Sequence, residues 1–194
     1  MALASPWLQQ RRLSHVAPFI EAPLLDVGCG DCAASTFAPR AYVGIDRDPS
    51  PLGGTPYGAQ RIQANADGLP FEDGTFKTVL AMAVLEHVDD PAACLTEALR
   101  VLRPDGRLVL TTPTPFGDRI HHTLARVNVT SKHAAEEHQS VMGPRALRRV
   151  IEEAGFVIER FQLFLLGGNQ LCVAAPRYAS PETAAICRRP REVA

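Results

Sequence analysis

The stretch LLDVGCGDCAAS, residues 24–35, decides how this chain is interpreted. Cys29 and Cys32 form a CxxC motif, the glycines form a GxGxxA turn, and Asp26 begins a DxGxG motif behind two leucines. The first pattern is typical of metal or redox sites, and the other two are typical of loops that approach a nucleotide-like ligand. The rest of the chain must decide between these interpretations.

The cysteines favour neither a metal site nor a disulfide scaffold. A structural zinc site normally takes four ligands in two spaced pairs, and no second CxxC exists among the five cysteines of the 194 residues. A helix N-terminus after Cys32 would suit a redox pair, but the glycines and Asp26 have no obvious role in that chemistry. We therefore interpret both cysteines as small residues in a tight turn and predict no metal site.

Short apolar runs alternate with helical patterns on both sides of this stretch. Parallel strands are predicted at 23–28, 41–46, 61–66, 78–82 and 107–112, and helices at 32–38, from Pro6, from Asp90-Pro91 and from Pro144. Residues 103–106, RPDG, are predicted to form a turn before the fifth strand. Residues 113–142 are predicted to form a long irregular excursion.

The C-terminal part is predicted to end in a hairpin. Residues 156–166 and 170–175 have strand character and are joined through Gly167-Gly168-Asn169. The expected fold is therefore α/β: a doubly wound, mostly parallel seven-stranded sheet, Rossmann-like, with a C-terminal antiparallel hairpin. Ligands of such sheets bind outside the carboxyl ends of the strands, where strand order reverses.

Composition and charge exclude several classes of protein. The formal net charge is -1, which argues against a nucleic-acid binder with a broad basic face. No apolar run reaches the roughly 18 residues of a membrane span, and the first residues lack the pattern of a signal peptide. We therefore expect a cytoplasmic protein that binds no nucleic acid and no membrane. The sequence does not indicate an oligomeric state.

The GxGxxA turn is compatible with two cofactors. Its glycines let the backbone approach a ligand, and Asp46 ends the second strand, where an acid accepts the hydroxyls of an adenosine ribose. Sites for NAD and for S-adenosylmethionine share this layout, so the motif alone leaves both open.

Further motifs resemble the class I S-adenosylmethionine-dependent methyltransferases. LLDVGCGDC is similar to their first motif, YVGIDRDP to their second, and NADGLPFEDGTF to the stretch before their fourth strand. LEHVDDP and LRPDGRLVLTTP resemble the small-molecule branch that includes the ubiquinone and menaquinone methyltransferases. The resemblance covers roughly residues 22–175 and implies S-adenosylmethionine as the cofactor.

The resemblance also implies roles for individual residues. Asp26 and the Gly28 backbone would accept from the cofactor ammonium, Asp46 would hold the ribose, and the base would lie near Asn65. The full set of expected cofactor-binding residues is Asp26, Gly28, Gly30, Asp46, Arg47, Asn65, Ala66, Leu69 and Ala81. The sequence departs from the family pattern at Cys32, Asn65 and Lys77, where a glycine and two aspartates are usual.

Histidines are the candidate bases for a methyl acceptor that must lose a proton. His87 follows the fourth strand, close to the expected methyl group, although a capping or packing role beside the core is the commoner one for a histidine in this position. His138 resembles a histidine that family members carry before the penultimate helix, although a solvated loop position fits it as well.

We expect one methyltransferase domain over residues 1–180, with residues 1–22 as an N-terminal lid helix carrying Trp7 and Arg11. Residues 113–142 would lie on the substrate side, and residues 181–194 would form a loose tail. The predicted function is methyl transfer from S-adenosylmethionine to an O, N or C atom of a small molecule. The alternatives are an NAD-dependent oxidoreductase and a non-catalytic methyltransferase-like binding protein.

Overall fold

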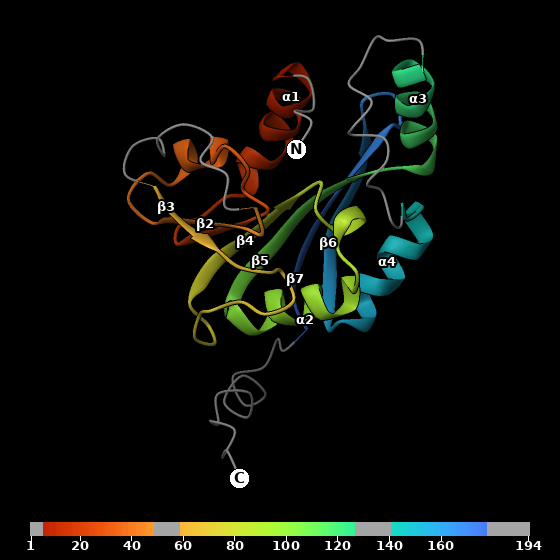
Figure 1. The fold of residues 1–194 in the computed structure, drawn as a ribbon. Coiled ribbons are helices and arrows are strands. Elements are labelled where there is room, and N and C mark those ends of the chain that lie inside the picture. The colour runs from red at the N-terminus through yellow and green to blue at the C-terminus, as the bar shows by residue number, and fades with distance from the viewer. Residues whose placement is uncertain (1–5, 49–58, 127–140, 178–194) are drawn as a thin grey trace.

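The computed structural model describes residues 6–48, 59–126 and 141–177. Its helices are α1 (Pro6–Val16), η1 (Ala17–Phe19), η2 (Ala33–Phe37), η4 (Leu85–His87), α2 (Pro91–Val101), α3 (Pro115–Arg126) and α4 (Pro144–Glu153), where η marks a 3-10 helix. Its strands are β1 (Leu24–Val27), β2 (Tyr42–Asp46), β3 (Gln60–Gln63), β4 (Phe76–Met82), β5 (Leu102–Pro113), β6 (Phe156–Phe164) and β7 (Asn169–Pro176). Figure 1 shows their arrangement.

The strands form a seven-stranded sheet in the order β3-β2-β1-β4-β5-β7-β6. The first five of these strands run parallel, and β7 is antiparallel to both β5 and β6. This confirms the predicted fold class, including the hairpin. Because the chain runs outward from β1 to β3 and returns to place β4 on the other side of β1, strand order reverses between β1 and β4. Their carboxyl ends mark the expected ligand site.

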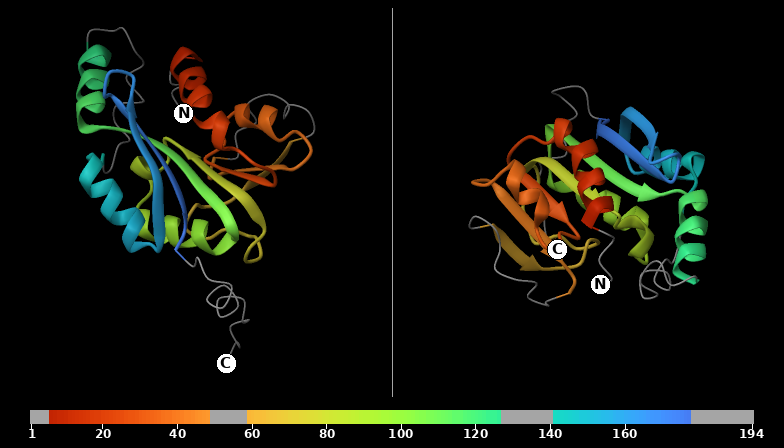
Figure 2. Two further views of the ribbon diagram at one scale, coloured as in Figure 1. Left: turned by 180° about the vertical axis from the view of Figure 1, so that it is seen from behind. Right: turned by 90° about the horizontal axis from the view of Figure 1, so that it is seen from above.

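Alternate residues of the central strands pack into two separate cores, one on each face of the sheet. Leu25 and Val79 contribute to the core beneath α2 and α4, whereas Leu24 and Leu80 contribute to the core beneath α1 and η2. The views in Figure 2 show the sheet between these two helical layers. Burial on both faces explains why the strands read as continuous apolar runs.

Three local predictions need correction. The helix expected at 32–38 is the shorter 3-10 helix η2, and RPDG lies inside β5, where the register jumps from Leu102 to Arg107 opposite β4. The excursion expected at 113–142 instead begins with α3. Thr114 caps the start of α3, because its Oγ1 accepts a hydrogen bond of 3.1 Å from the Gly117 N–H.

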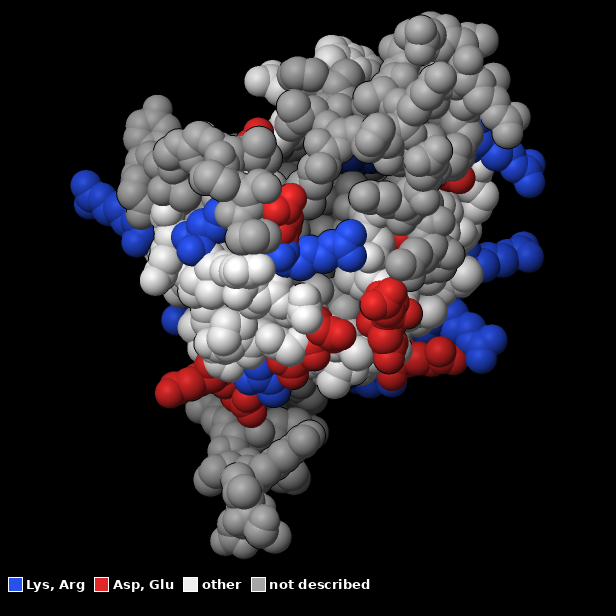
Figure 3. All heavy atoms as spheres, in the orientation of Figure 1, with Lys and Arg blue, Asp and Glu red and all other residues white. Residues whose placement is uncertain are grey.

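Charged side chains are mixed on the surface. On the described part of the face in Figure 3, Lys and Arg side chains alternate with Asp and Glu side chains and form no broad field of one sign. In the same described residues, no helix has both the length and the apolar character that crossing a membrane demands.

Candidate functional site

A cavity of about 490 Å³ lies at the carboxyl ends of β1, β2 and β4. Its walls also include part of α1, the segment after β3, η4, the start of α3 and the hairpin turn. Acidic side chains outnumber basic ones among the lining residues: Asp31, Asp46, Asp48, Asp67, Glu86, Asp89 and Asp118 against Arg12 and Arg47. The cavity lies where strand order reverses, and its charge favours a ligand that carries positive charge.

The glycine loop forms the floor of this cavity. Gly28 has φ +67° and a Cβ there would lie 2.6 Å from Val84 Cγ2, so a side chain at this position would be both strained and crowded. Gly30 has φ +49°, and an added Cβ would meet no atom within 4 Å. The loop backbone is therefore open to the cavity at Gly30, as close approach to a ligand requires.

Asp46 joins this loop to the end of β2. Its Oδ2 accepts a hydrogen bond of 3.0 Å from the Gly30 N–H, and its Oδ1 accepts one of 3.0 Å from the Asp48 N–H. Each oxygen keeps a further lone pair, and Asp46 lines the cavity. Asp46 is therefore a fixed acceptor at this end of the cavity. Its predicted role toward a ribose stays a prediction.

Asp26 is buried at the end of β1 and is not among the residues that line the cavity. Its Oδ2 accepts a hydrogen bond of 2.7 Å from Tyr42 Oη. Burial raises the pKa of Asp26 to about 7, and the Tyr42 hydrogen bond offsets only part of this effect. In this arrangement Asp26 supports the loop from within, and its predicted contact with the cofactor ammonium stays a prediction.

The raised pKa makes Asp26 a source of pH-dependent stability. An aspartate in an unfolded chain has a pKa of about 4, so between that value and about 7 the folded state binds more protons. The free energy of unfolding then falls as pH rises through this window. The side chain in Asp26→Asn stays uncharged at every pH. Between the two pKa values the free energy of unfolding of the wild type should therefore fall by about 2–4 kcal/mol relative to that of the variant. Urea denaturation at pH 4.5 and pH 8 measures this difference, and a difference that does not change with pH would contradict it.

The other expected cofactor residues divide into two groups. Arg47, Asn65 and Ala66 line the cavity together with Gly28, Gly30 and Asp46. Leu69 and Ala81 are not among the lining residues, and both pack into the core beneath α2 and α4. Their predicted contact with the cofactor stays a prediction.

The cysteine pair is buried beneath the loop. Cys29 Sγ accepts a hydrogen bond of 3.6 Å from Cys32 Sγ, and the missing side chain of Gly44 makes room for Cys29. Burial raises the pKa of Cys29 above the usual value for a thiol, which leaves little thiolate for redox chemistry. No cluster of three or more metal-ligating side chains occurs within 6–48, 59–126 and 141–177. Packing is the interpretation that these observations favour.

The candidate bases have different outcomes. His87 lines the cavity, as does its neighbour Glu86, whose Oε2 accepts a hydrogen bond of 3.0 Å from Thr112 Oγ1. Glu86 is 1% exposed. His138 lies outside the described residues. His87 is therefore near the expected reaction site, and its role as a base stays a prediction.

Arg12 is a cavity residue that the sequence patterns did not indicate. It extends from α1 beside Leu8 and Gln9, and its Nε donates a hydrogen bond of 3.1 Å to Asn169 Oδ1. Burial lowers the pKa of Arg12, and the charge of Glu86 opposes this effect. Among the described residues, no carboxylate forms a salt bridge with Arg12. The i, i+4 spacing of Leu8 and Arg12, which puts both on one face, was the available signal.

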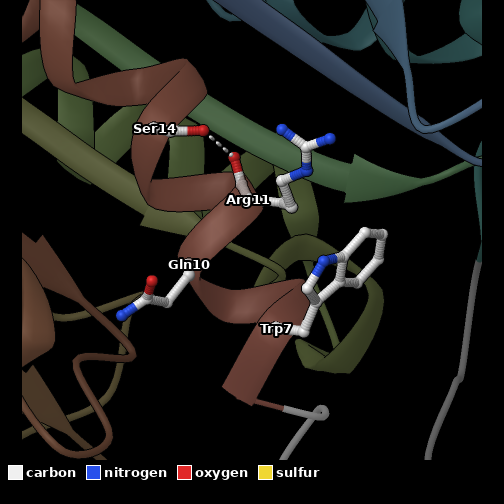
Figure 4. Close-up of a pocket in the computed structure, with 4 residues that line it drawn as sticks. All are labelled: Trp7, Gln10, Arg11 and Ser14. Carbon is white, nitrogen blue, oxygen red and sulfur yellow. Dashed lines mark hydrogen bonds between the residues drawn. The ribbon is translucent and has the colours of Figure 1, made fainter.

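Trp7 and Arg11 lie on another face of α1. They line a second hollow with Gln10 and Ser14, and Figure 4 shows the Trp7 ring and the Arg11 side chain on the same side of the helix. The Arg11 guanidinium lies 5.6 Å from the centre of the Trp7 ring. Neither side chain lines the large cavity, whereas Leu8, Gln9 and Arg12 of the same helix do. The expected lid role of residues 1–22 stays a prediction.

Lys77, which stands where the family usually has an aspartate, forms ion pairs far from the cavity. Its Nζ lies 3.0 Å from Asp105 Oδ2 and 3.9 Å from Glu21 Oε2. These contacts lie at the amino end of β4, whereas the cavity lies at its carboxyl end. The substitution therefore does not alter the cavity.

Comparison with known proteins agrees with the fold. The sequence model of the methyltransferase domain family matches residues 6–160. An uncharacterized methyltransferase of Mycobacterium sp. (strain KMS) is 35% identical over 131 residues, covering 63% of this chain and 51% of that protein. The ubiquinone biosynthesis O-methyltransferase of Xylella fastidiosa (strain 9a5c) is 38% identical over 124 residues, covering 58% and 48%.

A solved structure has the same fold. The S-adenosylmethionine-dependent methyltransferase from Mesorhizobium loti has a TM-score of 0.67 at 17% identity, covering 84% of this chain and 96% of that one. The chain spans about half the length of the curated relatives that it matches. A glycine loop open to a cavity, an acid at the end of β2 and a family match over most of the sequence agree with one another, and the chain belongs to the methyltransferase domain family.

Proposed function

We propose that this domain binds S-adenosylmethionine in the cavity and transfers its methyl group to a small-molecule acceptor. The observation that carries the proposal is the pairing of two fixed polar groups in one cavity: the Asp46 carboxylate and the Arg12 guanidinium. The cofactor has complementary groups at its two ends, a ribose diol and an amino acid carboxylate.

The adenosine end fits the wall formed by β2 and the segment after β3. Asp46 would accept hydrogen bonds from the ribose hydroxyls, because its carboxylate is already oriented by two backbone N–H groups. Ile45 and Ala66 supply apolar surface for the base, and Asn65 can supply a hydrogen-bond acceptor for its exocyclic amine.

The amino acid end fits the opposite wall. Of the three guanidinium nitrogens of Arg12, only Nε has a hydrogen-bond partner among the described residues. The two terminal nitrogens are therefore available to hold a carboxylate in a forked geometry. The open Gly30 backbone allows the cofactor to cross between Arg12 and Asp46. These residues fit S-adenosylmethionine, which supplies an activated methyl group on sulfur.

The protein contributes alignment and exclusion of water to such a displacement. His87 and Glu86 line the cavity beyond the end of β4. We propose His87 as the group that takes a proton from an acceptor hydroxyl or amine. Glu86, whose carboxylate accepts a hydrogen bond from Thr112, would orient the backbone next to His87.

A small acceptor is favoured by the size and surroundings of the site. The cavity of about 490 Å³ holds little beyond the cofactor and a small molecule. The face in Figure 3 mixes basic and acidic side chains in its described part, which does not favour a polyanion. A relative named as a ubiquinone biosynthesis O-methyltransferase also supports a small-molecule acceptor.

Isothermal titration with S-adenosylhomocysteine and with NAD tests the cofactor, and the proposal expects binding of the first and not of the second. Preference for NAD would favour an oxidoreductase instead. Methyl transfer is then measured with labelled S-adenosylmethionine against a panel of phenols, amines and small acids. Cofactor binding without transfer to any acceptor in the panel would favour the non-catalytic alternative.

A further inference from the structure

Side chains of one helix, α2, contact the segment between β3 and β4. Residues 64–75 contain neither helix nor strand, yet Ala64, Asn65, Ala66 and Asp67 form one wall of the cavity. Its Gly68 N–H donates to the Asn65 carbonyl at 3.3 Å, which closes a local turn. Further contacts are the hydrogen bonds from the Phe71 N–H to the Leu69 carbonyl at 2.8 Å and from the Ala64 N–H to the Asp46 carbonyl at 3.1 Å, and the packing of Leu69 into the core. Because the segment has no regular secondary structure, the rest of its order depends on side chains of neighbouring elements.

Glu97 and Arg100 on α2 provide these contacts. Arg100 donates to both oxygens of Glu97 at 2.8 and 2.7 Å, and the same guanidinium donates to the carbonyls of Leu69 at 2.9 Å and Phe71 at 2.7 Å. It also forms an ion pair of 2.8 Å with Asp73. Glu97 Oε2 accepts a hydrogen bond of 2.9 Å from the Leu69 N–H. We name these contacts the α2 clamp.

The helix that carries the α2 clamp is itself fixed at its start and along its buried face. α2 begins at the N-cap Asp90, whose side chain accepts from the N–H groups of Ala92 and Ala93, and its buried face packs Leu95 and Ala98 into the core. Both charged residues are only partly exposed, at 30% for the Arg100 side chain and 20% for that of Glu97. The Arg100 guanidinium contacts two backbone carbonyls and two carboxylates at once, which an ammonium cannot do with the same geometry.

We propose that Arg100 is a positioning residue that sets cofactor affinity through the wall at residues 64–67, although neither Arg100 nor Glu97 lines the cavity. This inference rests on the proposed function. Without Arg100, two backbone carbonyls and Glu97 lose a charged donor, and the wall samples conformations in which Asn65 and Ala66 no longer face the cavity. Part of the binding free energy then goes into ordering this segment, and the measured affinity falls.

The test compares Arg100→Ala and Arg100→Lys with a matched control. Arg149→Ala removes an arginine that forms an exposed i, i+4 pair of 2.8 Å with Glu153 on α4 and contacts no cavity segment. Both Arg100 variants should weaken S-adenosylhomocysteine binding about ten-fold or more, and lysine should restore little of it. The control should bind as the wild type does. 5′-Methylthioadenosine, which lacks the amino acid end, should lose affinity by the same factor as S-adenosylhomocysteine.

Hydrogen exchange provides a readout besides binding. In the Arg100 variants exchange should rise in residues 65–71 while β1 and β4 keep their protection. This comparison remains informative if Arg100→Ala folds poorly, because Arg100→Lys retains the charge. Wild-type-like affinity and exchange in Arg100→Lys, with loss only in Arg100→Ala, would overturn the requirement for a guanidinium. Wild-type affinity in both would overturn the α2 clamp, whereas a wild-type protein that binds no S-adenosylhomocysteine would overturn the proposed function itself.

Discussion

Asp46→Ala is expected to weaken S-adenosylhomocysteine binding by about 1–3 kcal/mol, roughly 5- to 150-fold. The variant loses an acceptor for the ribose, and the Gly30 and Asp48 N–H groups lose the carboxylate that orders them. The measurement is isothermal titration, with 5′-methylthioadenosine as a second ligand. Both ligands carry the ribose, so both should lose affinity by a similar factor.

The control for this variant is Asp105→Ala, which removes an exposed acid at the other end of the sheet. It should leave both affinities unchanged, even though it breaks the ion pair with Lys77. Unchanged binding in Asp46→Ala would contradict the assignment of Asp46 to the ribose.

Arg12→Ala is expected to separate the two ligands that Asp46→Ala affects equally. Removing a charge-assisted pair with the cofactor carboxylate should weaken S-adenosylhomocysteine binding by about 2 kcal/mol, roughly 30-fold. 5′-Methylthioadenosine has no carboxylate and should bind almost as it does to the wild type. Titration of both ligands with the same preparation measures this difference directly.

The adjacent arginine is a matched control for this experiment. Arg11 lies on another face of α1 beside Trp7 (Figure 4), outside the large cavity. Arg11→Ala should leave both affinities unchanged. Equal losses for the two ligands in Arg12→Ala would indicate that the arginine acts on the cavity as a whole, and the carboxylate assignment would be wrong.

The fold could be predicted because its signals are local. Continuous apolar runs such as the one around Leu24 require burial on both faces of a sheet, and the glycine pair after β1 requires a tight bend. The hairpin through Gly167 follows from the same kind of local signal. The helix α3 was missed although Thr114 before Pro115 is a start signal and Phe116, Ile120 and Leu124 recur at four-residue intervals, as on one face of a helix.

The site was predicted less completely because side-chain direction depends on contacts distant in sequence. Asp26 precedes the glycine loop as expected, yet its carboxylate is held by Tyr42, which is 16 positions away. Arg12 reaches the cavity only because α1 lies beside the hairpin residue Asn169, 157 positions further along. Spacing along the sequence could indicate neither contact. The backbone of Leu69 contacts Glu97 and Arg100 of α2, which its position in the sequence did not indicate.

A crystal structure with S-adenosylhomocysteine bound tests the central claim most directly. The account predicts the ligand in the cavity above Gly30, with its ribose hydroxyls within hydrogen-bond distance of Asp46 and its carboxylate on Arg12. A ligand bound elsewhere, or one bound in the cavity with its ribose away from Asp46, would contradict the account.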